Sequence, residues 1–150
     1  MKASKIIGLF ITVVQLAGTV AMVLGLYTMV SVFSTAIPRG EGEIELQIGD
    51  PIIIPFSITP SNPGYFDAKL SVSISLVVDG DQEIASDAAG LTIPAGSQIP
   101  VDLELSLSES TAEQYLLEGV DAEWVIEMHV TTLYDLISFS NTMTMSGGSQ

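Results

Sequence analysis

An uninterrupted apolar run, from Ile6 to Phe33, contains no charged side chain. A helix of roughly 20 apolar residues crosses a bilayer core about 30 Å thick. The run is longer than that, so it predicts a transmembrane helix that either tilts or extends beyond the lipid at one end. Lys2 and Lys5 precede it, and the positive-inside rule places that end in the cytoplasm. We therefore expect a single-pass protein of the cell membrane, partnered by the lipid bilayer, with its C-terminal domain extracytoplasmic.

A cleaved signal peptide is the alternative interpretation of this run. Lys2 and Lys5 would form its basic region, and Ser34-Thr35-Ala36 resembles a small-residue cleavage site. The apolar core of a signal peptide is about 7–15 residues long. The run here is much longer, which favours a retained anchor, and processing of the N-terminus stays open.

Charge is distributed very unevenly along the chain. It has 4 basic and 18 acidic residues, and all the acids lie beyond residue 40, where Lys69 is the one base, so that this part carries 1 − 18 = −17. Such a surface repels nucleic acid, which we exclude as a partner, and anionic headgroups. A solvated acidic surface explains the charge most simply, with cations or a basic partner as alternatives.

Small residues on one face of the helix predict close packing against another helix. Ala17, Ala21 and Gly25 recur at four-residue spacing, and Gly18 lies on nearly the same face. Gln15 supplies an amide that would prefer a partner inside lipid. We expect contact with a transmembrane helix of a partner subunit, or self-association. Small residues also occur in single anchors that pack against nothing.

The rest of the chain predicts an all-β domain. We assign residues 1–36 to a cytoplasmic stub and the transmembrane helix, 37–42 to a linker, 43–145 to the domain and 146–150 to a flexible tail. Alternating apolar residues indicate seven or eight short strands, typical of a β-sandwich. A short helix is expected at about 109–118, with Ser110 and Glu113 as a capping box and Gly119 after its end. The expected strands are 44–48, 52–58, 70–78, 83–85, 91–93, 99–107, 122–131 and 136–145.

Residues 54 to 107 contain two phrases that resemble a known family. One is Ile54-Pro-Phe-Ser-Ile-Thr-Pro-Ser-Asn62-Pro63-Gly-Tyr65, and the other is Leu91-Thr-Ile-Pro-Ala-Gly-Ser97. They resemble late embryogenesis abundant type 2 (water stress and hypersensitive response) domains of a membrane-anchored, archaeal type. The resemblance implies a fibronectin-III-like sandwich without catalytic residues, linked to desiccation stress or to lipid and partner binding. Pro55 and Pro60 depart from the family pattern.

Residues that could support catalysis or metal binding are few. The chain has no cysteine and a single histidine, His129, which argues against most metal sites and against a Ser-His-Asp triad. The carboxylates between Asp79 and Glu83 lack the spacing of a calcium loop and fit a hairpin turn instead. No nucleophile motif or phosphate-binding loop occurs. We expect no enzyme, no cofactor and no metal.

Two functions then remain. The first is an accessory or structural subunit of a membrane complex, or a tethered binding module. The alternative is a pilin- or archaellum-like filament subunit, because those proteins also combine a long apolar N-terminal helix with a β-sandwich head. A prepilin-type cleavage site would favour the filament. Lys5-Ile-Ile-Gly8 matches that site only loosely, and no acidic residue follows at the usual place.

Overall fold

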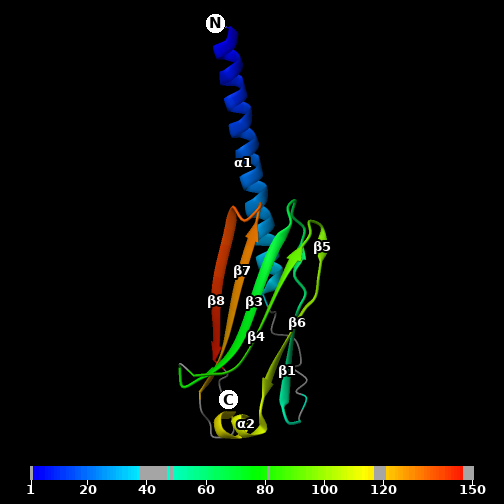
Figure 1. Ribbon diagram of the computed structural model, residues 1–150, viewed down its shortest axis with the longest axis vertical. Helices are drawn as coiled ribbons and strands as arrows, with labels where there is room; N and C mark the ends of the chain where they lie inside the picture. The colour runs from blue at the N-terminus through cyan, green and yellow to red at the C-terminus, as the bar shows by residue number, and fades with distance from the viewer. Residues whose placement is uncertain (1, 38–46, 48, 81, 117–120, 147–150) are drawn as a thin grey trace.

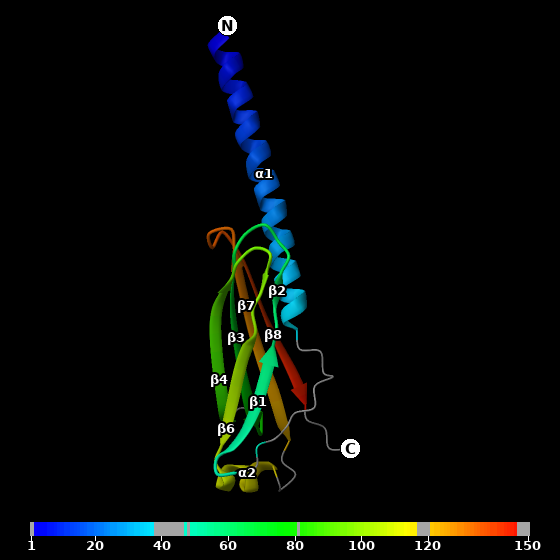
Figure 2. The same ribbon diagram turned by 90° about the vertical axis from the view of Figure 1, so that its right-hand side faces the viewer.

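The protein consists of a long N-terminal helix followed by a sheet-rich domain (Figure 1). The structure is a computed structural model and describes residues 2–37, 47, 49–80, 82–116 and 121–146. Helix α1 runs from Lys2 to Ala36. Among the described residues it is the one helix long and apolar enough to cross a membrane, over Ser4–Ala36. Figure 2 shows that its first part projects free of the domain, while its last part lies alongside it.

The larger layer of the domain is a four-stranded antiparallel sheet. Strand β3 (Ala68–Val78) lies inside this sheet between β4 (Gln82–Ile93) and β7 (Ala122–Thr132), and alternate residues along β3 are buried, as the alternation in its sequence predicted. Ile74, for example, lies opposite Ile126 of β7 and exposes 1% of its surface. The strand order is β4 (Gln82–Ile93), β3 (Ala68–Val78), β7 (Ala122–Thr132) and β8 (Ile137–Ser146).

A second layer covers the inner face of this sheet. Strands β1 (Ile52–Ile58) and β6 (Val101–Leu107) form an antiparallel pair, and the shorter β2 (Ser61–Asn62) and β5 (Ser97–Gln98) form another. Every second residue of β6 is buried, and these residues share one core with the inner face of the larger sheet. The Asp87 carboxylate joins the layers at one edge, because it accepts the N–H of Glu104 at 2.8 Å. The described part of the domain therefore has eight strands and one short helix.

The strand boundaries differ from the sequence prediction mainly in β4. The stretches 83–85 and 91–93 were expected to be separate strands, but they belong to one continuous strand. The reason is that β3 pairs with β4 from Ala68 to Val78, so the intervening small residues are also held in the ladder. The expected strand 44–48 lies mostly outside the described residues. Within it, Gln47 forms a bridge to Ile53.

The short helix α2 (Glu109–Leu116) begins where it was expected, but its N-cap lies two residues before the expected one. The Ser108 hydroxyl, and not that of Ser110, accepts the N–H of Thr111 at 3.2 Å. The Ser108 carbonyl accepts the N–H of Ala112 as well. Ser108 is therefore the N-cap, because its side chain satisfies an amide of the first turn. Gly119, the expected residue after the helix, lies outside the described residues.

Candidate functional site: the helix–domain junction

Helix α1 changes its environment along its length. Its side chains are exposed from Ser4 to Val20. From Gly25 onward one stripe is buried, at spacings of three and four residues that keep it on one side of the helix. Three members of this stripe belong to the hydrophobic core of the domain. The stripe consists of Gly25, Thr28, Met29, Val32 and Ala36, of which Met29, Val32 and Ala36 are the core residues.

Two threonine hydroxyls fix the helix to the loops of the domain. Thr28 Oγ1 accepts the N–H of Tyr65 at 3.1 Å, and Thr35 Oγ1 accepts the N–H of Ser61 at 2.9 Å. Thr28 Oγ1 also donates a hydrogen bond to the carbonyl of Leu24, so the hydroxyl both donates and accepts. Sequence analysis gave neither threonine this role, and it named Thr35 only within a possible cleavage site. Their spacing was no usable signal, because Thr12 and Thr19 are also seven residues apart in the same helix and are exposed.

A glycine allows the loop after β2 to reach the helix. A Cβ atom at Gly64 would overlap the side chain and backbone of Thr28. The loop itself is organised by Asn62, which is fully buried. Its amide nitrogen donates to the carbonyls of Phe66 and Ile93, and its oxygen accepts the N–H of Gly64 at 3.0 Å. The Asn62-Pro63 phrase quoted for the family resemblance therefore has a structural role in this chain.

Two pairs of aromatic rings also join the helix to the domain. The rings of Phe33 and Phe139 meet edge to face, with centroids 4.9 Å apart. Tyr27 and Tyr65 form a looser pair at 6.3 Å. Strands β2, β3, β7 and β8 all contact α1, so the helix end packs against both layers of the domain.

The predicted helix-packing residues are not all available to a partner. Gln15, Ala17 and Gly18 are exposed, and Ala21 is half-buried. Gly25 departs from the prediction, because a Cβ atom there would lie 2.7 Å from Ile137 Cδ1 and 3.4 Å from Leu133 Cδ2. Its lack of a side chain serves a close approach within this chain. Contact of the other four with a partner helix stays a prediction.

The turn between β7 and β8 lies against the helix at this point. Leu133, Tyr134 and Asp135 adopt positive φ values of 53°, 54° and 63°, a region that few non-glycine residues occupy. Lys69 Nζ forms an ion pair with Asp135 at 2.8 Å, and Thr131 Oγ1 donates to the same carboxylate at 3.1 Å. The pKa of Asp135 is lowered below its usual value of 3.8, mainly by the hydrogen bond from Lys69 and then by that from Thr131.

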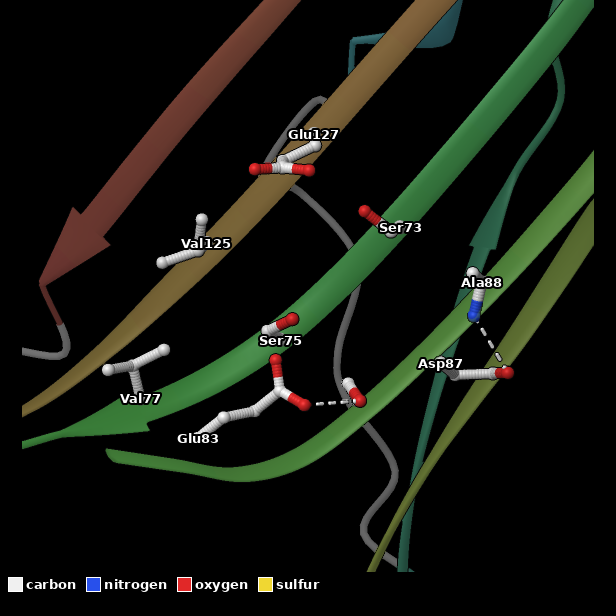
Figure 3. Close-up of a pocket in the computed structure, with 9 residues that line it drawn as sticks. Ser73, Ser75, Val77, Glu83, Asp87, Ala88, Val125 and Glu127 are labelled. Carbon is white, nitrogen blue, oxygen red and sulfur yellow. Dashed lines mark hydrogen bonds between the residues drawn. The ribbon is translucent and has the colours of Figure 1, made fainter. Parts of the chain in front are cut away.

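The outer face of the larger sheet is polar and has an open hollow of about 560 Å³ (Figure 3). Ser73 and Ser75 of β3 lie between Glu127 of β7 and Glu83 of β4, whose carboxylate accepts the hydroxyl of Ser86 at 2.7 Å. Nowhere in the described residues do three histidine or carboxylate side chains gather as metal ligands would. His129 is exposed and hydrogen-bonds Ser140 across the strand pair. The arrangement is that of a hydrated sheet face.

Comparison with known proteins does not assign a family. No protein-family model and no curated protein matches the chain. Three solved structures that resemble it have TM-scores below 0.5. A protein from Archaeoglobus fulgidus is 10% identical, with a TM-score of 0.47 over 72% of this chain and 94% of that one. A putative β-galactosidase from Bacteroides fragilis is 10% identical, with a TM-score of 0.48 over 68% of this chain and 15% of that one. A β-glucuronidase of glycoside hydrolase family 2 is 9% identical, with a TM-score of 0.42 over 67% and 11%. This chain thus spans only a small part of either glycosidase.

Proposed function

We propose that the protein is a non-enzymatic, single-pass membrane protein that displays an acidic β-domain outside the cell. It would serve as an accessory or structural subunit of a membrane complex, or as a tethered binding module. The main support for this proposal is that α1 has an exposed first part and a last part packed against the domain. From Ser4 to Leu24 the helix is apolar and largely exposed, and at about 1.5 Å per residue it covers about 30 Å, the thickness of one hydrocarbon core.

The packing of the helix end supports an anchor that is retained. Cleavage after Ala36 would remove Met29, Val32 and Ala36 from the hydrophobic core of the domain. It would also remove the hydroxyls that hold the backbone of Ser61 and Tyr65. A signal peptide is discarded after secretion and contributes nothing to the mature core, so a role in the core favours retention.

The same packing favours a structural role over a mobile tether. A domain on a flexible linker can search a large volume for its ligand. Here the helix is continuous from Lys2 to Ala36 and ends inside the domain. The domain therefore keeps a fixed orientation relative to its anchor, which suits a subunit that occupies a defined place in a complex.

The finer fold and family assignments are also proposals. The four-stranded sheet and the β1–β6 pair with their shared core support a β-sandwich, and we propose the fibronectin-III-like type. The assignment to late embryogenesis abundant type 2 domains rests on the sequence phrases, and Asn62, which is buried and hydrogen-bonded, gives one of those phrases a structural role in this chain. An experimental structure tests both assignments. The order of the strands in the two sheets tests the fold type, and the way the chain connects the strands on either side of Asn62 tests the family.

Protease accessibility in intact cells tests the topology. With the N-terminus inside, an epitope tag after Gln150 is removed by added proteinase K, and a tag before Met1 is protected until the cells are lysed. The two tags serve as controls for each other. Protection of the C-terminal tag in intact cells would contradict the extracytoplasmic placement of the domain.

A filament subunit is the second candidate, and one observation favours it. The exposed half of α1 is a straight apolar rod joined rigidly to the domain, and packing such rods together would give a filament core. Intact-mass measurement with electron microscopy of the cell surface separates the candidates. Filaments built from a chain that has lost its first residues would support this candidate, and a chain with Met1 dispersed in the membrane would support the anchor.

A further inference from the structure

The structure indicates where the lipid would end along α1. From Ser4 on, Gly25 is the first buried residue of the helix, and it lies against Leu133 and Ile137 at the β7–β8 turn. Almost one turn later, Thr28 bonds the loop that carries Tyr65. If the exposed segment before Gly25 spans the bilayer, as the proposed function requires, both loops lie at the depth of the lipid headgroups. Figures 1 and 2 show the β7–β8 turn at the end of the domain where the helix emerges.

These loops expose aromatic and apolar side chains. Tyr134 is 92% exposed, Leu136 79% and Tyr65 66%. Tyr27, on the helix itself, is 51% exposed and pairs with Tyr65. We call these four residues the tyrosine collar. Tyrosine is enriched at membrane–water interfaces, because its ring enters the apolar boundary while its hydroxyl stays hydrated.

The turn is built so that Tyr134 and Leu136 are exposed while Leu133 packs against the helix. Three successive residues in the left-handed region, Leu133 to Asp135, are held by the Lys69–Asp135 pair and by the hydrogen bond from Leu136 N–H to the Leu133 carbonyl. Leu133 is thereby directed toward the helix, while Tyr134 and Leu136 remain exposed. An open hollow of about 350 Å³ between Tyr65, Lys69 and Tyr134 separates the two loops.

The charge of the domain is compatible with lipid at this end. Asp135 is paired with Lys69, and Asp67 accepts the N–H of Ala95. Many of the other described carboxylates lie toward the opposite end, at the β3–β4 turn and on α2, including Asp79, Glu109 and Glu113. The end next to the helix is therefore the one that approaches lipid with the smallest electrostatic cost.

We propose that the tyrosine collar docks the domain onto the outer leaflet, with Tyr134 and Leu136 at the boundary between headgroups and acyl chains. This inference rests on the proposed function, because it places α1 in the bilayer. The occupant is the lipid itself, of a zwitterionic type that the acidic domain does not repel. Docking would hold the domain upright and keep its polar sheet face in water.

Depth-dependent fluorescence quenching tests the proposal on the full chain. The native chain has no cysteine, so single cysteines can be labelled with an environment-sensitive nitrobenzoxadiazole dye. Ser138→Cys reports on the collar from an exposed neighbouring position and leaves all four collar residues in place. Val14→Cys reports on the helix, and Glu113→Cys on the far end of the domain. Each protein is reconstituted in phosphatidylcholine vesicles that contain lipid spin-labelled at a shallow or a deep acyl position.

We expect the deep label to quench the dye at position 14, the shallow label to quench it at position 138, and neither to quench it at 113. The double change Tyr134→Ser with Leu136→Ser should weaken quenching at 138, because the rigidly joined helix and domain can then tilt so that the turn leaves the lipid boundary, and should leave quenching at 14 unchanged. An unchanged melting temperature of this variant in detergent shows that it folds.

The failure of the collar and the failure of the anchor are distinguishable. Quenching at 14 without quenching at 138 would overturn the collar and leave the anchor. A blue-shifted dye at 138 that lipid does not quench would mean contact with protein, and would also overturn it. Absence of quenching at 14 would overturn the anchor, and with it the placement of the collar in lipid.

Discussion

At the scale of single residues, Gly64 shows how closely the helix and the domain are fitted. A Cβ atom there would overlap Thr28, the residue that binds the neighbouring Tyr65 amide. The overlap involves backbone as well as side chain, so a rotamer change does not relieve it. Overpacking of this kind costs about 1–3 kcal/mol.

Gly64→Ala should therefore lower the melting temperature of the full chain in detergent, by roughly 2–4 °C for each kcal/mol lost. Gly90→Ala is the matched control, because a Cβ atom there would meet only the Leu70 carbonyl oxygen at 3.9 Å. Thermal unfolding followed by Trp124 fluorescence measures both variants. Equal melting temperatures for the two would mean that the loop does not press against the helix.

Asp135 gives the β7–β8 turn a dependence on pH. Its pKa is lowered below 3.8, first by the hydrogen bond from Lys69 and then by that from Thr131. A lowered pKa means that the charged carboxylate stabilises the fold at neutral pH, and that this contribution is lost as pH falls through the lowered value. The group is exposed, so the effect is small.

Asp135→Asn should lower the melting temperature slightly at pH 7, and the difference from wild type should disappear as pH falls below 3.8. Glu113→Gln removes an equal charge on α2, away from Lys69, and controls for net charge. A melting difference at position 135 that stays constant down to the most acidic pH would show that the ion pair is not its cause.

At the scale of elements, α1 combines an exposed segment and a buried segment that one hydropathy profile does not separate. Lipid and a protein core both select apolar residues, so Val14 and Val32 look equivalent in the sequence although one is exposed and the other fully buried. The excess length of the apolar run was attributed to tilt or to extension beyond the lipid. The structure shows that the end of the run is used inside the protein, because Met29, Val32 and Ala36 belong to the core of the domain.

The strands were predictable where burial alternates with exposure. The pattern from Leu70 to Val78 indicated the correct inner face, and the Asp79-Gly80 turn has the positive φ values that such a hairpin needs. The alternation does not reveal partners that come from distant parts of the chain. The closeness of Gly64 to Thr28, and the packing of Gly25 against Ile137, arise from tertiary contacts that no local pattern encodes.

At the scale of the whole molecule, the central claim is that the end of α1 is part of the domain and the beginning of α1 is its anchor. Burial of one Met or Val side chain stabilises a fold by about 1.5–3 kcal/mol. Met29, Val32 and Ala36 together therefore supply a large part of the roughly 5–15 kcal/mol by which a domain is stable. Removing them should affect the domain far more than removing the exposed segment.

The most direct test compares the thermal unfolding of two shortened chains, residues 24–150 and residues 37–150. The first keeps the buried helix stripe, and we predict that it unfolds cooperatively at a temperature close to that of the domain in the full chain. The second lacks the stripe and the threonines that hold Ser61 and Tyr65, and we predict that it shows no cooperative transition or melts well below the first. Equal and cooperative melting of both chains would contradict the account, because the helix would then be an anchor along its whole length.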